Sequence, residues 1–309
     1  PEARRPPELL TRDHVARRIL AEVAAGRGSP HGGAFLDIAW IQDHVPDGAD
    51  HIRRKLPGMY HQFKELADID ITEEPMEVGP TTHYGMGGIR VDPESQMSTV
   101  PGLFAVGECA TGLHGANRLG GNSLSDLLVF GRRAGEHAAA WAAEHGAGII
   151  DPDEIDAEGG RVLEPFRRPS GNKKDNPMQV QQELQSVMQD KAGIIRKQTE
   201  LEEALDQVRD LRERAARASV PGNREYNPGW HTALDLHNLL TVSEAVIRAA
   251  MERTESRGAH TRDDYPEKDP GWGDTNLVVR RGADGEMTLG RHKIPEIPDE
   301  LKRIIQEQG

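Results

Sequence analysis

Cysteine is almost absent from this 309-residue chain, which contains only Cys109. A single thiol cannot form an internal disulfide, and it cannot supply the several thiolates of a Cys-based zinc or iron–sulfur site. Because a small thiol packs well in a protein interior, we expect Cys109 to be buried and structural rather than redox-active. We predict no metal site.

The sequence also lacks long apolar runs and an excess of basic residues. No apolar stretch approaches the ~18 residues of a membrane-spanning helix, and no apolar signal-peptide core follows the first residues. Any work at a membrane therefore requires another chain as its anchor. The net charge of −13 argues against nucleic acid as a partner, because phosphate binding depends on clustered Lys and Arg.

The glycine-rich fingerprint of dinucleotide-binding folds is missing as well. No Gly-x-Gly-x-x-Gly follows a predicted strand, because Gly85, Gly87 and Gly88 are wrongly spaced, as are Gly146 and Gly148.

Two glycine-rich turns are the most informative segments that are present. His83 precedes the glycines of residues 81–88, and Arg118 lies between Gly115-Ala116 and Gly120-Gly121. Glycines let backbone approach a flat ligand, and the two cations suit carboxylates. This pattern predicts an anion site beside a cofactor.

A strand and a helix are predicted to frame the second turn. Residues 101–108 have the pattern of a short apolar strand that ends at Glu108, and a helix opens near residue 122 and runs to about Ala143. Ser123 and Asp126 fit a capping box. The start of such a helix offers N–H groups and a positive dipole end to negative charge.

The motifs extend along most of the chain and point to one family. Residues 81–88, 107–109, 113–132 (with Arg-Leu-Gly-Gly-Asn-Ser-Leu-Ser-Asp at 118–126) and 253–262 (Arg-Thr-Glu-Ser-Arg-Gly-Ala-His-Thr-Arg) resemble the flavoprotein subunit of succinate dehydrogenase and fumarate reductase. The resemblance implies FAD as cofactor and hydride transfer between FAD and succinate or fumarate. It also implies electron transfer to an iron–sulfur subunit, membrane anchor subunits, and a peripheral location on the cytoplasmic face of the cell membrane.

The same resemblance implies roles for six residues. Arg12 corresponds to the proton donor or acceptor at the substrate. His83 and Arg118 correspond to carboxylate-binding residues, and Glu108, Ser123 and Leu124 to flavin-contacting residues. From the residues alone, Arg12 is equally explained as a surface arginine, His83 as a structural histidine, and Arg118 as a partner of Asp126 or Glu108.

The expected fold class is α+β, and its boundaries combine the resemblance with composition. We predict the end of a capping domain (1–78), the C-terminal part of a FAD-binding α/β domain (79–146), a Gly/Pro-rich linker (147–176), a three-helix bundle (177–258) and an irregular C-terminal extension (259–309). Because the dinucleotide fingerprint lies upstream in the resembled family, we expect a C-terminal portion that is inactive by itself.

Local patterns predict individual elements. A helix is expected at 11–25, capped by Thr11 and ended by Gly26, and another at 52–66 with a break at Pro57-Gly58. Extended segments are expected at 32–38, 74–78 and 276–280, and a short surface helix at 301–305. Apolar stripes predict the core of the bundle: Val180, Leu184, Val187, Met188, Ile194, Ile195, Leu201, Leu205, Val208, Leu236, Leu239, Leu240, Val246, Ile247 and Ala250.

Two alternatives remain at this stage. An L-aspartate oxidase shares the His-Tyr, Gly-Leu-His-Gly-Ala-Asn-Arg and Asn-Ser-Leu features, although Leu119-Gly120-Gly121 and residues 253–260 favour the succinate or fumarate enzyme. A non-catalytic remnant that docks to a partner is the second alternative. Arg257, His260 and Arg262 are expected to dock domains, since nothing near them orients a nucleophile.

Overall fold

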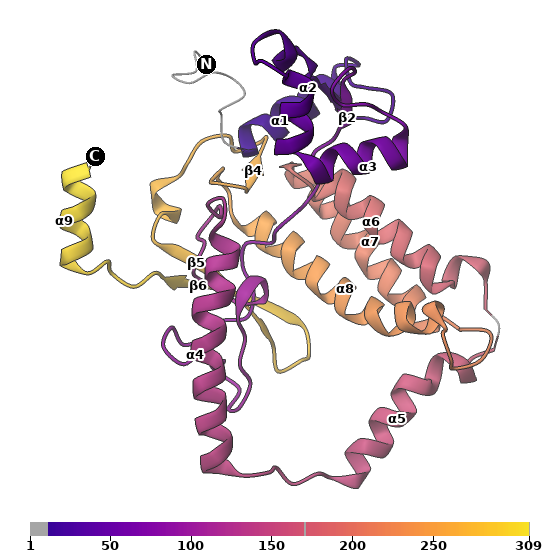
Figure 1. Ribbon diagram of the computed structural model, residues 1–309. Helices are drawn as coiled ribbons and strands as arrows, with labels where there is room; N and C mark the ends of the chain where they lie inside the picture. Colours follow the sequence, from indigo (N-terminus) through magenta and orange to yellow (C-terminus); the bar gives the residue numbers. More distant parts are fainter. Residues whose placement is uncertain (1–11, 170, 309) are drawn as a thin grey trace. The chain divides into compact units, whose positions relative to one another are not determined.

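A computed structural model describes residues 12–169 and 171–308 of the protein. The chain divides into two compact units, Pro1–Gly85 and Met86–Gly309, and each is described by itself (Figure 1). Among the described residues, helices dominate and the strands form three two-stranded sheets. The predicted combination of helices and sheets is confirmed at this level.

The first unit begins with a helix and continues into a strand pair that carries two further helices. α1 spans Arg12–Ala24, within one residue of the predicted bounds, and ends at Gly26, whose φ is +75°. Thr11, the predicted cap, lies outside the described residues. The other elements are β1 (Ala34–Leu36), η2 (Ala39–Asp43), α2 (Gly48–Lys55), α3 (Pro57–Ala67) and β2 (Met76–Val78).

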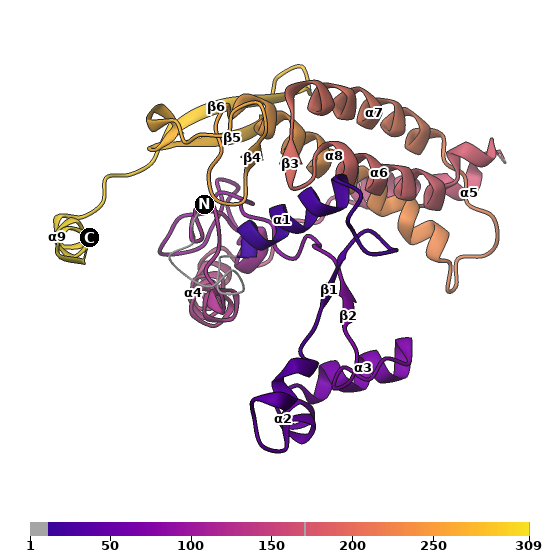
Figure 2. The same cartoon turned by 90° about the horizontal axis from the view of Figure 1, so that it is seen from above.

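The predicted break at Pro57 is confirmed, since it separates α2 from α3. Proline suits the first position of α3 because its missing N–H would have no partner there. β1 and β2 pair antiparallel, with Ala34 opposite Val78 (Figure 2). A small core lies at their end. It consists of Ile52, Ile71 and Met76, packed by Ile38, Ile41, Tyr60, Phe63, Ile69 and Val78.

The second unit opens with irregular chain where a strand was predicted. Residues 101–108 form no strand, and Phe104 makes only an isolated bridge to Met97. The backbone bends at both ends of this segment, since Gly102 and Gly107 take φ values of +80° and +70°. A ladder cannot continue through such bends, and the chain turns into the 3₁₀ helix η3 (Gly107–Cys109).

The predicted capping box is also wrong. α4 spans Asn122–His145, two residues beyond the predicted end, and its N-cap is Gly121, with φ +83° and no side-chain cap bond. Asp126 does not reach back to the helix start, because its carboxylate lies against the ring of His114.

A helix occupies most of the predicted linker. α5 spans Pro152–Arg167, and the side chain of Asp151 caps it by accepting from the N–H of Asp153 at 2.9 Å. The indole N–H of Trp230 donates to the carbonyl of Val162 at 2.6 Å. Such tertiary contacts outweigh the low helix propensity of the two glycines and the proline within α5. η4 (Lys173–Asp175) follows.

The predicted three-helix bundle is confirmed. α6 (Pro177–Lys191), α7 (Gln198–Arg217) and α8 (Pro228–Glu252) lie side by side (Figure 1). Its buried core comprises Val180, Leu184, Val187, Ala192, Leu201, Ala204, Leu205, Val208, Leu211, Leu236, Leu240, Ile247 and Ala250. Leu239 and Val246, predicted in this core, are each 38% exposed.

The bundle ends earlier than its first stripe suggested. α6 stops at Lys191, so Ile194 lies outside the helix and Ile195 belongs to β3 (Ile195–Arg196). β3 pairs in parallel with β4 (Thr261–Arg262) and so brings the C-terminal motif onto the bundle.

The chain after β4 confirms the predicted strand and terminal helix. It contains η5 (Pro270–Trp272), the antiparallel pair β5 (Thr275–Arg281) and β6 (Met287–Lys293), and α9 (Asp299–Gln308). None of the helices in the described ranges combines the length and the apolar content needed to cross a bilayer.

Candidate functional site

The six candidate residues belong to different units. Arg12 and His83 lie in the first unit, whereas Glu108, Arg118, Ser123 and Leu124 lie in the second. The geometry is therefore described separately for each group.

In the second unit, the backbone of the first glycine-rich motif runs beside the second. The N–H of Ile89 donates to the carbonyl of Cys109 at 2.7 Å, and the N–H of Thr111 donates to the carbonyl of Ile89 at 3.0 Å. Gly88 has a φ of +135°, and a Cβ there would lie only 2.4 Å from the carbonyl oxygen of Cys109. Only glycine permits this approach.

Glu108 sits on the short turn that this contact supports. η3 packs against α4, since a Cβ on the buried Gly107 would lie 2.5 Å from Cδ2 of Leu127. The side chain of Glu108 is exposed. Cys109 is exposed too, contrary to the prediction, and its thiol donates to the carbonyl of Val106 at 3.1 Å.

Arg118 is half-buried in the loop between η3 and α4. One guanidinium nitrogen donates to the carbonyl of Leu119 at 3.2 Å. The carbonyl of Ala116, two residues earlier, accepts from the N–H of Ala259 at 2.9 Å. The predicted turn around Arg118 therefore contacts the C-terminal motif directly.

Ser123 and Leu124 occupy the first turn of α4, as predicted for flavin-contacting residues. The N–H of Leu124 already donates to the carbonyl of Gly121 at 3.2 Å. The surface around this turn is apolar, because Leu124 and Leu128 are 67% and 77% exposed. Leu119, Leu127 and Val129 are exposed as well. Such a concentration of exposed aliphatic side chains is typical of a surface that something else covers.

Arg12 and His83 are both exposed in the first unit. Arg12 is the first residue of α1, where a cation opposes the helix dipole, while Asp13 pairs with Arg17 at 3.0 Å on the same helix. His83 lies in a segment without regular structure that follows β2.

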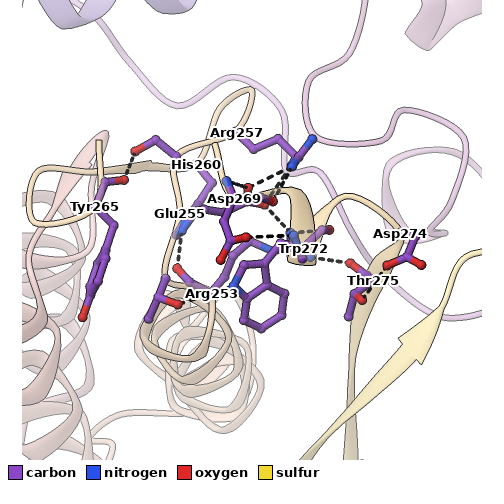
Figure 3. A network of polar contacts seen from close by, with 12 residues as sticks. Arg253, Glu255, Arg257, His260, Tyr265, Asp269, Trp272, Asp274 and Thr275 are labelled. Atoms are coloured by element: carbon purple, nitrogen blue, oxygen red, sulfur yellow. Dashed lines mark hydrogen bonds and ion pairs between the residues drawn. The ribbon is translucent and has the colours of Figure 1, made fainter. Parts of the chain in front are cut away.

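The C-terminal motif surrounds a buried acid that the sequence analysis had given no role. Glu255 is fully buried and accepts from Arg253 at 2.7 Å, from Arg257 at 2.7 and 2.9 Å, and from the N–H of Asp269 at 2.9 Å (Figure 3). Burial raises the pKa of Glu255, but the hydrogen bonds from Arg257, Asp269 and Arg253 outweigh it and lower the pKa to about 2.

A sequence signal for this network exists. In Arg253-Thr254-Glu255-Ser256-Arg257 the charged residues alternate with neutral ones, and alternate residues of an extended segment share one face. Two arginines on one face with an acid between them are suited to a shared ion-pair cluster.

The motif is also attached to neighbouring elements. Arg253 donates to the carbonyl of Thr275 at 2.6 Å, and its guanidinium lies over Trp272 at 4.8 Å (Figure 3). Arg291 lies over Trp272 as well, at 4.3 Å. The contacts join the end of α8 to η5 and to the β5–β6 pair.

Arg262 and His260 make equally specific contacts. Arg262 is fully buried, binds both carboxylate oxygens of Asp264 at 2.8 Å, and donates to the carbonyl of Ala250 at 2.7 Å. The ring of His260 lies 3.1 Å from the carbonyl of Arg253 and 3.0 Å from a guanidinium nitrogen of Arg196. No nucleophile is among these contacts.

Other candidate sites are weak. Across residues 12–169 and 171–308, no cluster of three or more His, Cys, Asp or Glu could hold a metal ion. A polar cavity of about 460 Å³ lies between the end of α5 and the segment after α7, and none of the six candidate residues lines it.

Comparison with known proteins relates both parts of the chain to flavoproteins. Residues 2–124 match a family model described as FAD binding domain, and residues 181–300 match one described as Fumarate reductase flavoprotein C-term. Both matches overlap motifs that the sequence analysis had singled out.

Relatives and solved structures agree with these matches. The chain is 40% identical over 279 residues to the succinate dehydrogenase flavoprotein subunit of Coxiella burnetii, a match that covers 85% of this chain and 46% of that protein. It is 39% identical over 268 residues to the fumarate reductase flavoprotein subunit of Haemophilus influenzae, covering 85% and 43%. The chain thus spans about half the length of the curated relatives it matches.

The fold is found in a solved structure as well. A chain of Mycobacterium smegmatis Sdh1 in complex with UQ1 superposes with a TM-score of 0.84 and is 50% identical. The match covers 99% of this chain and 50% of that one.

Proposed function

The chain belongs to the succinate dehydrogenase and fumarate reductase flavoprotein family, and we propose that it supplies substrate- and flavin-contacting residues to an enzyme that interconverts succinate and fumarate. The observation that carries this proposal is the joining of three motif segments in the second unit. Residues 88–89 bond to residues 109–111, and Ala259 bonds to Ala116 beside Arg118. The motifs that imply the activity are thus parts of one folded arrangement.

The residues present suit one end of FAD. The exposed carboxylate of Glu108 can accept from ribityl or sugar hydroxyls, and the first turn of α4 presents Ser123 and a positive dipole end. The exposed Leu124 offers apolar contact to a flat ring. When bound, FAD supplies the acceptor or donor of hydride.

Substrate roles follow the family pattern. Arg118 and His83 bind the two carboxylates of the substrate, and the planar fork of Arg118 gives a bidentate contact that a lysine cannot reproduce. Arg12 moves the proton that accompanies hydride transfer. These assignments use cations at both carboxylates and keep proton transfer separate from binding.

We further propose the finer organisation that the family implies. Residues 1–78 form the end of a capping domain, 79–146 the C-terminal part of a FAD-binding domain, and 177–258 a helical domain. The family also suggests an iron–sulfur protein as electron partner, membrane anchor subunits, and peripheral attachment at the cytoplasmic face. Co-purification with an iron–sulfur protein tests the first of these partners.

Replacement of Arg118 by lysine tests the substrate site. In the flavin-loaded protein we expect Arg118→Lys to lower kcat/KM for succinate by at least about 2 kcal/mol, or roughly 30-fold, because a charge-assisted bidentate bond is lost. Arg209→Lys, on the exposed face of α7, is the control and should leave kcat/KM unchanged. Near-normal turnover in Arg118→Lys would remove Arg118 from the site. Faster oxidation of aspartate than of succinate would favour the aspartate oxidase alternative.

A further inference from the structure

We propose that Gly258 and Glu255 are positioning residues that hold the loop carrying Arg118 in its dicarboxylate-binding geometry. This inference rests on the proposed function, since it assigns Arg118 to the substrate. Neither residue is expected to touch the substrate or the flavin.

The contact between the two segments allows almost no freedom. The N–H of Ala259 donates to the carbonyl of Ala116 at 2.9 Å. A Cβ on Gly258 would lie 2.3 Å from that carbonyl oxygen, 2.6 Å from its carbon and 2.8 Å from Cβ of Ala116. These neighbours are backbone atoms or a Cβ, which cannot rotate away. Gly258 also has a φ of +60°, which glycine adopts without strain.

Gly258 and Ala259 form the tip of a closed turn. The N–H of Arg257 donates to the carbonyl of His260 at 2.8 Å, and the N–H of His260 donates to the carbonyl of Arg257 at 3.1 Å. With both ends bonded to each other, the turn contacts Ala116 as a rigid element. Its position is therefore set by whatever holds Arg257 and His260.

Glu255 holds the first end. Its buried carboxylate binds the guanidinium of Arg257 through two hydrogen bonds, and it binds Arg253 and the N–H of Asp269 as well. A buried carboxylate with these four bonds fixes both the position and the orientation of Arg257. The turn therefore cannot slide along the loop that carries Arg118.

His260 holds the second end. One ring nitrogen lies 3.1 Å from the carbonyl of Arg253 and the other lies 3.0 Å from a guanidinium nitrogen of Arg196. The carbonyl requires an N–H donor and the guanidinium requires an acceptor, so the ring is neutral with its proton on Nε2. The turn is thereby tied to α8 and β3.

The loop that receives this support is otherwise flexible in composition. Gly112, Gly115 and Gly121 flank Arg118 with φ values of +111°, +56° and +83°. Such glycines permit a tight approach to a ligand but increase the conformational entropy that binding must overcome. The bond to Ala259 removes part of that freedom before the substrate arrives.

The test uses Gly258→Ala in the flavin-loaded protein, with malonate as a non-reacting dicarboxylate. Because the added Cβ displaces the backbone at Ala116, we expect the malonate dissociation constant and KM for succinate to rise about tenfold or more, with the flavin spectrum retained. Gly285→Ala is the matched control, since φ there is +86° but the nearest atoms belong to the flexible Arg281 side chain at 3.6 Å. The control should bind malonate normally.

A double-mutant cycle separates positioning from general damage. If Gly258 acts through Arg118, adding Gly258→Ala to Arg118→Lys should weaken malonate binding much less than it does in the wild-type protein. Additive losses in the cycle, or unchanged malonate binding in Gly258→Ala, would overturn the inference while leaving the proposed function intact. Unchanged binding in Arg118→Lys would instead overturn the proposed function.

Glu255→Gln provides a second variant if Gly258→Ala does not fold. It keeps the shape of the side chain but loses the charge that binds both arginines. The expected result is weaker malonate binding that is again reduced in the Arg118→Lys background, and normal binding in Glu255→Gln would contradict the role of Glu255.

Discussion

Nε2 of His114 lies 3.2 Å from a carboxylate oxygen of Asp126, and the two side chains are only 9% and 6% exposed. The contact joins the loop that carries Arg118 to the second turn of α4. A carboxylate buried in this way needs a partner, because desolvation without a hydrogen bond is costly. Asp126 therefore serves the loop and not the helix cap that its position after Ser123 suggested.

We expect Asp126→Asn to lower the free energy of unfolding by about 1–3 kcal/mol, because it weakens a buried charge-assisted bond. Ser123→Ala should change stability by no more than about 0.5 kcal/mol, since Ser123 makes no cap bond. Urea unfolding of both variants measures the difference. A larger loss in Ser123→Ala would restore the capping box.

Arg12 and His83 should separate proton transfer from binding in the flavin-loaded protein. We expect His83→Ala to weaken malonate binding, whereas Arg12→Gln should leave it largely intact while turnover falls by on the order of 10²-fold or more. Arg18→Gln, an exposed change on the same helix, is the control. Equal losses of malonate affinity in the Arg12 and His83 variants would make Arg12 a binding residue.

His260 should make stability depend on pH. Burial lowers the pKa of its imidazole from 6.5 to about 4, as do the nearby charges of Arg196, Arg262 and Arg253, against the opposing bond to the carbonyl of Arg253. Between these two values the unfolded chain binds a proton that the folded protein does not. The contribution of His260 to stability is therefore complete above pH 6.5 and decreases as the pH falls towards 4.

Comparison with His260→Gln isolates this effect. The difference in unfolding free energy between wild type and variant should fall with decreasing pH by up to about 1.4 kcal/mol per pH unit within that window. Denaturant unfolding at several pH values provides the measurement. A flat difference would mean that His260 is not kept neutral by its surroundings.

Two neighbouring leucines of α8 test the bundle core. Leu240 is 1% exposed and Leu239 is 38% exposed. We expect Leu240→Ala to cost about 2–5 kcal/mol in unfolding free energy because it leaves a cavity. Leu239→Ala has the same change in helix propensity but should cost less than about 1 kcal/mol. Similar losses from both substitutions would contradict the packing of α8.

The bundle shows what periodicity can predict. Apolar residues at helical spacing indicated α6, α7 and α8, and most of the predicted core residues are buried. Periodicity cannot tell the centre of a buried face from its edge, because the two differ only in what packs above them. Leu239 and Val246 lie at such an edge.

α5, the capping box and residues 101–108 show where local patterns fail. α5 forms despite Gly159, Gly160 and Pro165 because Trp230 and Val220 bond to its carbonyls. Residues 101–108 contain the apolar side chains of a strand, but Gly102 and Gly107 bend the backbone away from a ladder. Exposure of Cys109 has the same cause, since the chain turns there instead of continuing as a strand.

The sequence by itself determined the chemistry of this protein: its family, its flavin, and the cations suited to a dicarboxylate. Those properties depend on residue types at short spacings, which a motif preserves. Only the tertiary structure decided that Gly258 lies against Ala116 and that Glu255 is buried between Arg253 and Arg257. These contacts join segments far apart in the chain, and their energy comes from close packing and from burial of charge. No local pattern specifies which backbone carbonyl a distant N–H will meet.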